Sequence, residues 1–388
     1  MNLLKRAFSL SLLIFAVCIV VPRAHAQSLS LGTLTLQNNH PYPCINAPNG
    51  NDFLAGSTCL NATVSGCPNN VAPINLTFGW FVPANSKGTV VMFSGGPGTT
   101  PAAPVGDMQA YAAKQAKTFE VVQVEWTTAW EDPSPGGTGG NILDAACRPA
   151  TFLNFVNTNP ILHVPNTGMC AQGSSAGSAA VAYSMAWYGA ASYLNNVELI
   201  SGPVLSEIDQ GCIYPKQPDL TLCGTTRGVK QYGCSAKTKA WTDNQTYVSP
   251  YTETVDVWSG VPINSCATSN ASGYLPVWQQ MSIVDGTSGT ISPTFNYPTT
   301  HMHGWLCAGY ATKNHHLLCD KPHCPNNSAS EGNFFYQRFS GAQHPPGFQL
   351  TGVLNCVQEE GIAQGTDPDS NGPASTAINN DMTLNCHI

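Results

Sequence analysis

The sequence predicts an α/β fold, with a mostly parallel sheet flanked by helices. Three observations carry this prediction: continuous apolar runs rich in β-branched residues, helical segments between these runs, and glycine-rich turns where the runs end. Such runs are typical of parallel strands that are buried on both faces, and their alternation with helices indicates crossover connections. Hydrophobic residues make up 42% of the chain, which is enough to bury a core and excludes a disordered protein.

The predicted elements alternate regularly along the first 200 residues. Short alternating runs within residues 27–80 indicate early strands and turns. Apolar runs then predict strands, and segments of helical composition predict helices between them. The strands are expected at 89–93, 119–126, 169–174 and 197–200, and the helices at 108–117, at 144–157 and from Ala176 to about Leu194.

The second half of the chain is less regular. Residues 205–295 contain four cysteines, many Thr, Gly and Asn residues and little periodicity, so we expect a cap insertion tied by disulfides. Residues 27–388 should therefore form one large domain that carries this insertion. The sheet is expected to resume with strands at 301–306 and 348–354, and helices are expected at 331–339 and 370–384.

Residues 1–26 predict a secretory signal peptide. Lys5 and Arg6 precede an apolar run at 7–21, and the sequence A-H-A precedes the expected cleavage site after Ala26. The run is short for a membrane span, so we expect a secreted or periplasmic protein without a stable membrane anchor; an uncleaved anchor is the alternative. Cleavage leaves fourteen of the fifteen cysteines, an even number that suits up to seven disulfides in an oxidising compartment.

The low charge of the chain limits its partners. Charged residues make up 10% of the sequence and the formal net charge is -7, with no basic tract to neutralise phosphates. A nucleic-acid partner is therefore not expected. We expect a monomer that requires no cofactor.

A group of histidines and cysteines makes a zinc site an alternative. Zinc favours these side chains as ligands, but no Cys-x-x-Cys pair supports such a site here, and we expect no metal. The group comprises His301, His303, Cys307, His315, His316, Cys319, His323 and Cys324.

The motif G-x-S-x-G occurs at residues 173–177, with the sequence GSSAG. A predicted strand leads into it and an alanine-rich helix leads out, which is the context that a nucleophile elbow requires. The flanking glycines permit a strained turn with close backbone packing. Ser175 is therefore the candidate nucleophile; a serine in an ordinary strand-to-helix turn is the alternative.

A second glycine-rich motif, SGGPG at residues 94–98, directly follows the predicted strand at 89–93. A loop of this kind lets backbone N–H groups approach a carbonyl oxygen and form an oxyanion hole. We expect one donor from Gly96 and the other from Ala176, the residue after the nucleophile. Pro97 lacks an N–H group and cannot donate.

These two motifs, in this order, resemble those of the α/β-hydrolase fold family, and most of all of its secreted bacterial esterases and depolymerase-type lipases. The loop at 95–98 is also similar to that of prolyl aminopeptidases in the same superfamily. The resemblance covers residues 85–205 well and residues 295–386 loosely. It implies acyl transfer by a triad of Ser, Asp or Glu, and His, in that order along the chain.

The family pattern places the triad acid after the strand at 301–306. Residues 307–311 contain no carboxylate, and Asp320 is the first acid downstream. Asp320 is therefore the candidate acid. Glu207 and Asp209, after the strand at 197–200, are the alternative.

The family pattern places the triad histidine after the last strand, where Gln358 stands. A glutamine amide does not accept a proton at useful pH and cannot act as a general base. His323, in the loop after the preceding strand, is our first choice. His344, which precedes the last strand, and Glu359, as an unusual base, are alternatives.

His387, close to the C-terminus, is a further candidate for the base. It would approach the loop after the last strand if Cys356 pairs with Cys386. The sequence alone does not determine this pairing, because fourteen cysteines allow many connectivities.

Trp126 and Trp130 follow the strand at 119–126 and are expected near the same rim of the sheet. Aromatic side chains there could bind a hydrophobic acyl group; packing beneath the cap is the equal alternative.

The sequence thus predicts a secreted serine hydrolase that cleaves small-molecule or polymeric carboxylic esters. A non-catalytic binding protein on the same fold is a second hypothesis, supported by Gln358. A serine peptidase is a third, and it would need an acidic cluster in the cap, for which Glu207 and Asp209 are weak candidates.

Overall fold

A computed structural model gives the three-dimensional structure of the chain. It describes residues 29–38, 40–95, 98–101, 112–132, 142–174, 176–200, 297, 299–307, 348–353 and 373–388. The expected cap at 205–295, the helix at 331–339 and the signal peptide at 1–26 lie outside these residues.

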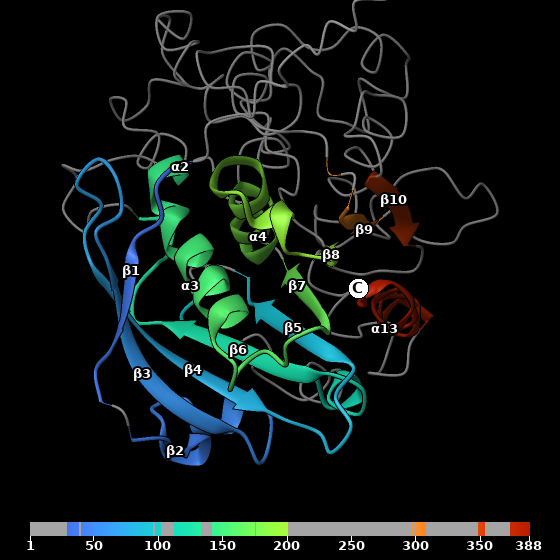
Figure 1. The fold of residues 1–388 in the computed structure, drawn as a ribbon, viewed down its shortest axis with the longest axis horizontal. Coiled ribbons are helices and arrows are strands. Elements are labelled where there is room, and N and C mark those ends of the chain that lie inside the picture. The colour runs from blue at the N-terminus through green and yellow to red at the C-terminus, as the bar shows by residue number, and fades with distance from the viewer. Residues whose placement is uncertain are drawn as a thin grey trace, which may run out of the picture.

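The described residues form one ten-stranded sheet (Figure 1). Its strand order is β1-β3-β4-β6-β5-β7-β8-β9-β10, and β2 pairs with β3 at one side. The strands are β1 (Thr33–Leu36), β2 (Tyr42–Pro43), β3 (Thr58–Ser65), β4 (Ile74–Phe81), β5 (Gly88–Phe93), β6 (Glu120–Trp126), β7 (Gly168–Ser174), β8 (Asn196–Ile200), β9 (His301–Cys307) and β10 (Phe348–Val353).

The sheet is antiparallel on its N-terminal side and parallel over the rest of its width. From β6 through β5, β7, β8 and β9 to β10 every pair is parallel. The N-terminal strands pair antiparallel up to the β4–β6 pair. All residues of β5 to β8 are buried, as their continuous apolar runs predict for parallel strands covered on both faces.

Helices cover both faces of the sheet. On one face α3 packs against α4, and α4 contacts β5, β7 and β8; α13 contacts β8 on the other face. Every residue of α4 is buried, as expected for a helix that is apolar on all sides. The helices are α2 (Ile142–Ala145), α3 (Cys147–Thr158), α4 (Ala176–Tyr188) and α13 (Pro373–Asn385), with 3-10 turns η1 (Cys44–Asn46), η2 (Gly50–Asp52) and η3 (Ala190–Ser192).

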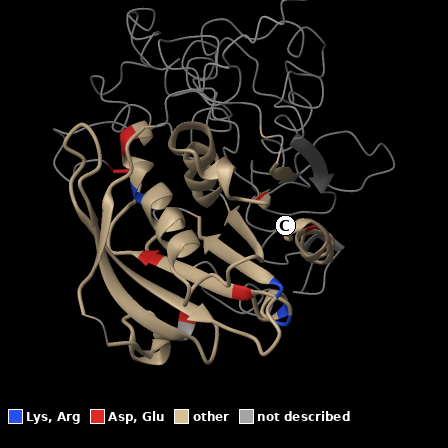
Figure 2. Ribbon diagram, viewed as in Figure 1, with Lys and Arg blue, Asp and Glu red and all other residues tan. Residues whose placement is uncertain are grey.

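The predicted fold class is confirmed: the chain has an α/β-hydrolase-like, mostly parallel sheet flanked by helices. The strands predicted at 89–93, 119–126, 169–174 and 197–200 are present within a residue at each end. Figure 2 shows isolated charged residues over the described ribbon, in keeping with the low charge of the sequence.

The helix after the G-x-S-x-G motif is shorter than predicted. The sequence predicts a helix to about Leu194, but α4 ends at Tyr188. Gly189 follows in the left-handed conformation, with φ of 74°, and glycine in this conformation ends many helices. The chain then continues through η3 into β8.

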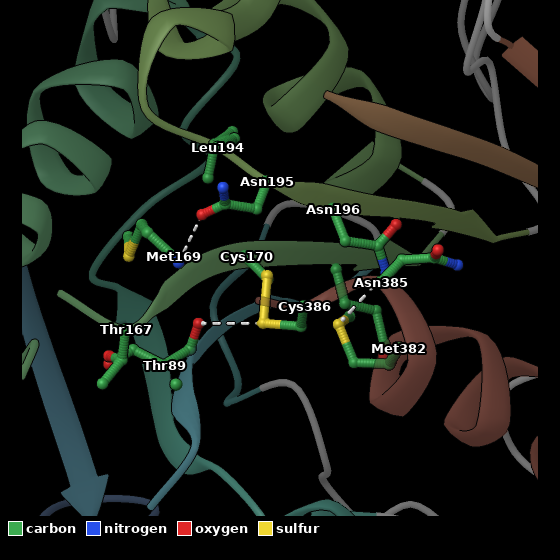
Figure 3. Close-up of a disulfide and its surroundings, with 12 residues drawn as sticks. Thr89, Thr167, Met169, Cys170, Leu194, Asn195, Asn196, Met382, Asn385 and Cys386 are labelled. Carbon is green, nitrogen blue, oxygen red and sulfur yellow. Dashed lines mark hydrogen bonds between the residues drawn. A yellow bond between two sulfur atoms is a disulfide. The ribbon is translucent and has the colours of Figure 1, made fainter. Parts of the chain in front are cut away.

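Three disulfides join the six cysteines whose side chains the structure describes. Cys44 pairs with Cys59, Cys67 pairs with Cys147, and Cys170 pairs with Cys386. The third joins β7 to the residue after α13 (Figure 3). Within the described parts of the chain, no helix has the length and apolar character needed to cross a membrane.

Candidate functional site

The junction between β7 and α4 is built on two glycines that admit no side chain. A Cβ on Gly173 would lie 2.2 Å from the carbonyl oxygen of Gly177. Contacts below 3.0 Å force the structure to shift, so the strand end and the first turn of the helix pack backbone to backbone. β7 therefore leads into α4 with close backbone packing, in the strand-to-helix order that the sequence predicts.

The same helix start packs against the strand that carries the second motif. A Cβ on Gly177 would lie 2.4 Å from the carbonyl oxygen of Phe93 and 2.6 Å from that of Ser94. Phe93 and Gly173 are also register partners in the parallel pair of β5 and β7. The loop after β5 and the start of α4 are thus neighbours at the carboxyl edge of the sheet.

The loop after β5 is anchored on both sides. The Ser94 hydroxyl donates a 2.6 Å hydrogen bond to the carbonyl oxygen of Thr100. The backbone N–H of Trp126 donates a 2.9 Å hydrogen bond to the carbonyl oxygen of Gly98. Gly98 has φ of 71°, and a Cβ there would lie 2.7 Å from the Trp126 ring. These contacts hold the ends of the loop beside β6.

Ala176 is the first residue of α4 and is buried. The first N–H groups of a helix have no partner within the helix and carry its positive end, so the Ala176 amide suits an oxyanion donor. The Ser178 hydroxyl donates a 3.0 Å hydrogen bond to the carbonyl oxygen of Ile200, which fastens this helix start to β8.

Trp126 and Trp130 are each only 1% exposed and belong to the core on the α3 and α4 face. The Trp126 ring meets the Phe152 ring edge-on, with 6.3 Å between centroids. The Arg148 guanidinium donates a 2.9 Å hydrogen bond to the carbonyl oxygen of Trp130. The two indoles thus pack within the described core, and their contact with a substrate stays a prediction.

Several predicted site residues lie outside the described residues, so the structure does not place them. They are Ser175, Gly96, Asp320, His323 and His344, together with the alternative acids and base Glu207, Asp209 and Glu359.

The structure corrects the pairing on which His387 depended. Cys386 bonds to Cys170 near the start of β7, and not to Cys356. A Cβ on Gly168 would lie 2.7 Å from the backbone nitrogen of His387, so His387 lies at the amino end of β7. Strands rise about 3.3 Å per residue, which puts this end about 20 Å from the end that leads to Ser175. His387 is too far away to act as the base.

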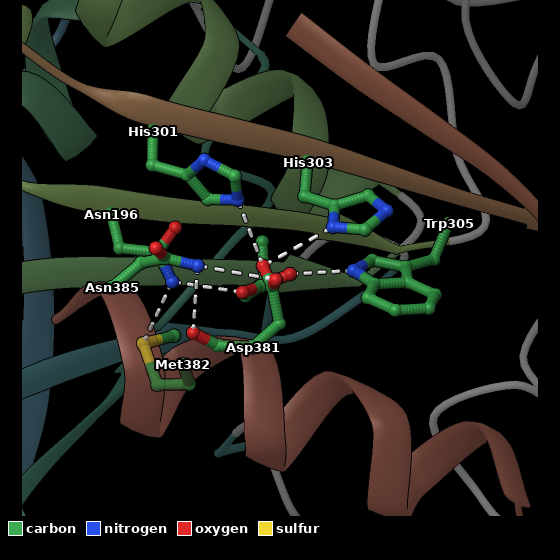
Figure 4. Close-up of polar contacts among 8 residues, drawn as sticks. Asn196, His301, His303, Trp305, Asp381, Met382 and Asn385 are labelled. Atoms are coloured by element: carbon green, nitrogen blue, oxygen red, sulfur yellow. Dashed lines mark hydrogen bonds and ion pairs between the residues drawn. The ribbon is translucent and has the colours of Figure 1, made fainter.

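A second polar cluster joins β9 to α13 (Figure 4). The sequence placed His301 and His303 among possible zinc ligands but did not indicate their partner Asp381. The Asp381 carboxylate oxygen Oδ2 lies 3.1 Å from His301 Nε2 and 3.1 Å from His303 Nδ1. The Asn385 amide donates a 3.2 Å hydrogen bond to the other carboxylate oxygen, Oδ1. Each oxygen of Asp381 therefore has its own partners.

Glu198 of β8 lies beside this cluster and is completely buried. The Asn196 amide donates a 2.8 Å hydrogen bond to Oε1 of Glu198, and the Trp305 indole N–H donates to Oε2. Burial raises the pKa of Glu198 well above its usual range, and the adjacent Asp381 carboxylate raises it further.

Asp381 responds in the opposite direction. Burial alone would raise its pKa, but hydrogen bonds from His301 and His303 outweigh burial and hold the pKa of Asp381 well below its usual range. The pKa values of the two neighbouring carboxyl groups are thus shifted in opposite directions, upward for Glu198 and downward for Asp381.

One signal for this cluster was present in the sequence. His301 and His303 are two residues apart on a predicted strand, so their side chains point to the same face. Their partner Asp381 is 78 residues further along than His303, and nothing local to either segment indicates the contact.

No protein-family model and no curated protein matches this sequence. Among solved structures, the chain is similar to an esterase of Pyrobaculum calidifontis, with 11% identity and a TM-score of 0.42 over 89% of this chain and 90% of that chain. The chain is also similar to esterase Est22, with 12% identity and a TM-score of 0.43 over 84% of this chain and 80% of that chain. A third similar structure is EstE1, a thermophilic carboxylesterase from a metagenomic library. Its identity is 11% and its TM-score is 0.40, over 83% of this chain and 88% of that chain. The fold assignment rests on the sheet order and connections, and these likenesses add nothing to it.

Proposed function

We propose that this protein is a secreted serine hydrolase that cleaves carboxylic esters through an acyl-enzyme, with Ser175 as the nucleophile. The observation that carries the proposal is the contact of Gly177 with the backbone of Phe93 and Ser94. It brings a strand-to-helix turn that contains a serine next to a glycine-rich loop, which is the arrangement that acyl transfer needs.

In this proposal the Ser175 hydroxyl attacks the ester carbonyl, and its proton passes to the base. The N–H groups of Gly96 and Ala176 stabilise the negative charge that develops on the carbonyl oxygen. The alcohol leaves with a proton from the base, and water then releases the acid by the same steps in reverse.

Asp320 and His323 complete the proposed triad, and Trp126 and Trp130 would border the acyl group. The substrate is a small-molecule or polymeric ester, and the protein acts as a monomer without cofactor, nucleic acid or membrane anchor. Three disulfides among the described residues support an oxidising compartment.

Covalent labelling with a fluorophosphonate tests the nucleophile. The wild-type chain should be labelled at Ser175, and Ser175→Ala should lose labelling and reduce the turnover of a short-chain nitrophenyl ester on the order of 10^4-fold or more. Ser174→Ala is the matched control, because it removes the neighbouring hydroxyl and should retain the label.

Other results would favour the alternatives. Equal turnover by wild type and Ser175→Ala would rule out the proposal, and a folded chain that takes no label would indicate a binding protein. Labelling together with cleavage of amides at a free N-terminus would indicate a peptidase. If His344→Ala, and not His323→Ala, abolished turnover, His344 would be the base.

A further inference from the structure

The polar cluster between β9 and α13 has the composition of a metal site. His301 and His303 present two imidazole nitrogens on one face of β9, and α13 presents the carboxylate of Asp381 to both of them. The three possible ligand atoms lie within 4.8 Å of one another. Two imidazoles and one carboxylate, with a further position left for water, form a set that zinc binds in proteins.

The two distances from the Asp381 carboxylate to the imidazoles suit a tetrahedral ion. Bonds of 2.0–2.1 Å from zinc to nitrogen or oxygen place neighbouring ligands about 3.3 Å apart. Asp381 Oδ2 is already 3.1 Å from each imidazole nitrogen. An ion would take the place of the two hydrogen bonds, and each imidazole would turn a lone pair toward it by changing tautomer.

The surrounding side chains hold the candidate ligands in place. Asn385 binds Oδ1 of Asp381 and leaves Oδ2 toward the imidazoles. The His303 ring stacks on the Trp305 ring, with 3.9 Å between centroids, and Trp305 is itself bonded to Glu198. Partners of this kind orient the ligands of protein metal sites.

Two of the three candidate ligands are partly exposed to solvent. The side chain of His303 is 7% exposed, but those of His301 and Asp381 are 21% and 16% exposed. Solvent therefore reaches the cluster on the side of His301 and Asp381.

We propose that His301 Nε2, His303 Nδ1 and Asp381 Oδ2 bind one Zn²⁺ ion, with water in the remaining position. The ion fastens α13 to the sheet. His303 is level with Glu198 and Gln172, and Ser174 is level with Ile200 and Trp305. The site thus lies below the carboxyl edge and two strands away from β7, and it is separate from the site of the proposed ester hydrolysis.

Titration of the chelator-treated full-length chain with zinc chloride, against a chromophoric chelator, tests the site. His301→Ala and Asp381→Asn should each lose affinity by more than about 100-fold, and Asn385→Ala, which removes an orienting partner, by about 10- to 100-fold. His387→Ala is the matched control, because this histidine is exposed near the end of α13 and should leave the affinity unchanged.

A measurement on the unaltered chain covers the case in which these variants do not fold. Histidine-selective ¹⁵N NMR should show zinc-dependent shifts of one Nε2 and one Nδ1, because the two imidazoles face Asp381 through different nitrogens. Absence of zinc binding, unchanged affinity in folded His301→Ala and Asp381→Asn, or shifts confined to Nε2 atoms would overturn the proposal. Fluorophosphonate labelling of Ser175 would be unaffected by any of these results, so the two proposals fail separately.

Discussion

At the scale of single residues, burial shifts the pKa values of several of the few charged side chains. Burial raises the pKa of Glu131 to about 8 and lowers the pKa of Arg148 to about 10. The Arg148 guanidinium compensates by donating hydrogen bonds of 2.7 and 2.9 Å to the carbonyl oxygens of Ala72 and Trp130. The buried Arg148 side chain therefore joins the segment before β4 to the segment after β6.

Glu120 lacks compensation of this kind among the described residues. It is 1% exposed at the start of β6, and neither of its carboxylate oxygens has a hydrogen-bond partner there. Burial raises its pKa from 4.5 to about 7. Between these two pH values the folded protein binds a proton that the unfolded chain releases, so stability falls as pH rises through this range.

We expect Glu120→Gln to remove this loss, because the amide stays neutral at every pH. The stability of the variant relative to wild type should rise from about pH 4.5 to about pH 7, the range between the two pKa values, and then level off. Urea denaturation at a series of pH values measures the difference. A constant difference across the range would show that Glu120 ionises normally in the folded protein.

At the scale of elements, the strand-to-helix junction could be predicted because its signals are local. The apolar run, the glycines at 173 and 177 and the alanine-rich segment are consecutive in the sequence. The end of α4 depends instead on the conformation of one residue, because the helix stops where Gly189 adopts the left-handed conformation that glycine favours.

The close packing at this junction predicts a large effect of a single methyl group. Gly177→Ala should destabilise the protein by about 1–3 kcal/mol, because its Cβ would overlap carbonyl oxygens that belong to the backbone. It should also slow fluorophosphonate labelling of Ser175, since either α4 or the loop after β5 must move.

Gly66→Ala is the control for this substitution. Gly66 has φ of 71° with no atom within 4 Å of a Cβ, so alanine there strains only the local backbone. It should destabilise the protein but leave the labelling rate unchanged. If Gly177→Ala labelled at the wild-type rate, the contact between helix and loop would not position the nucleophile.

At the scale of the whole molecule, one covalent bond joins the middle of the sheet to the end of the chain. Cys170 and Cys386 are 216 residues apart and their side chains are buried (Figure 3). Around them Ile378 and Met382 of α13 complete the core on the second face of the sheet. The last helix, α13, thus packs as part of the core and is covalently attached to the sheet through Cys386.

We expect the removal of this disulfide, by Cys170→Ala with Cys386→Ala, to cost about 5 kcal/mol, because it frees a very long loop in the unfolded chain. The matched control is Cys44→Ala with Cys59→Ala. This disulfide is equally buried but spans 15 residues, and its loss should cost about 3 kcal/mol. Urea denaturation of both variants gives the comparison, and an equal or smaller loss for the Cys170 pair would contradict it.

The sequence by itself determined the order of strands and helices in the described chain, the fold class and the position of the G-x-S-x-G turn. These follow from patterns within short segments, where each residue's neighbours are known. Only the tertiary structure decided that Cys386 bonds to Cys170, that His387 therefore lies at the amino end of β7, and that Asp381 meets His301 and His303. Those contacts join segments far apart in the chain, and they form only because α13 packs back onto the face of the sheet that β8 and β9 share.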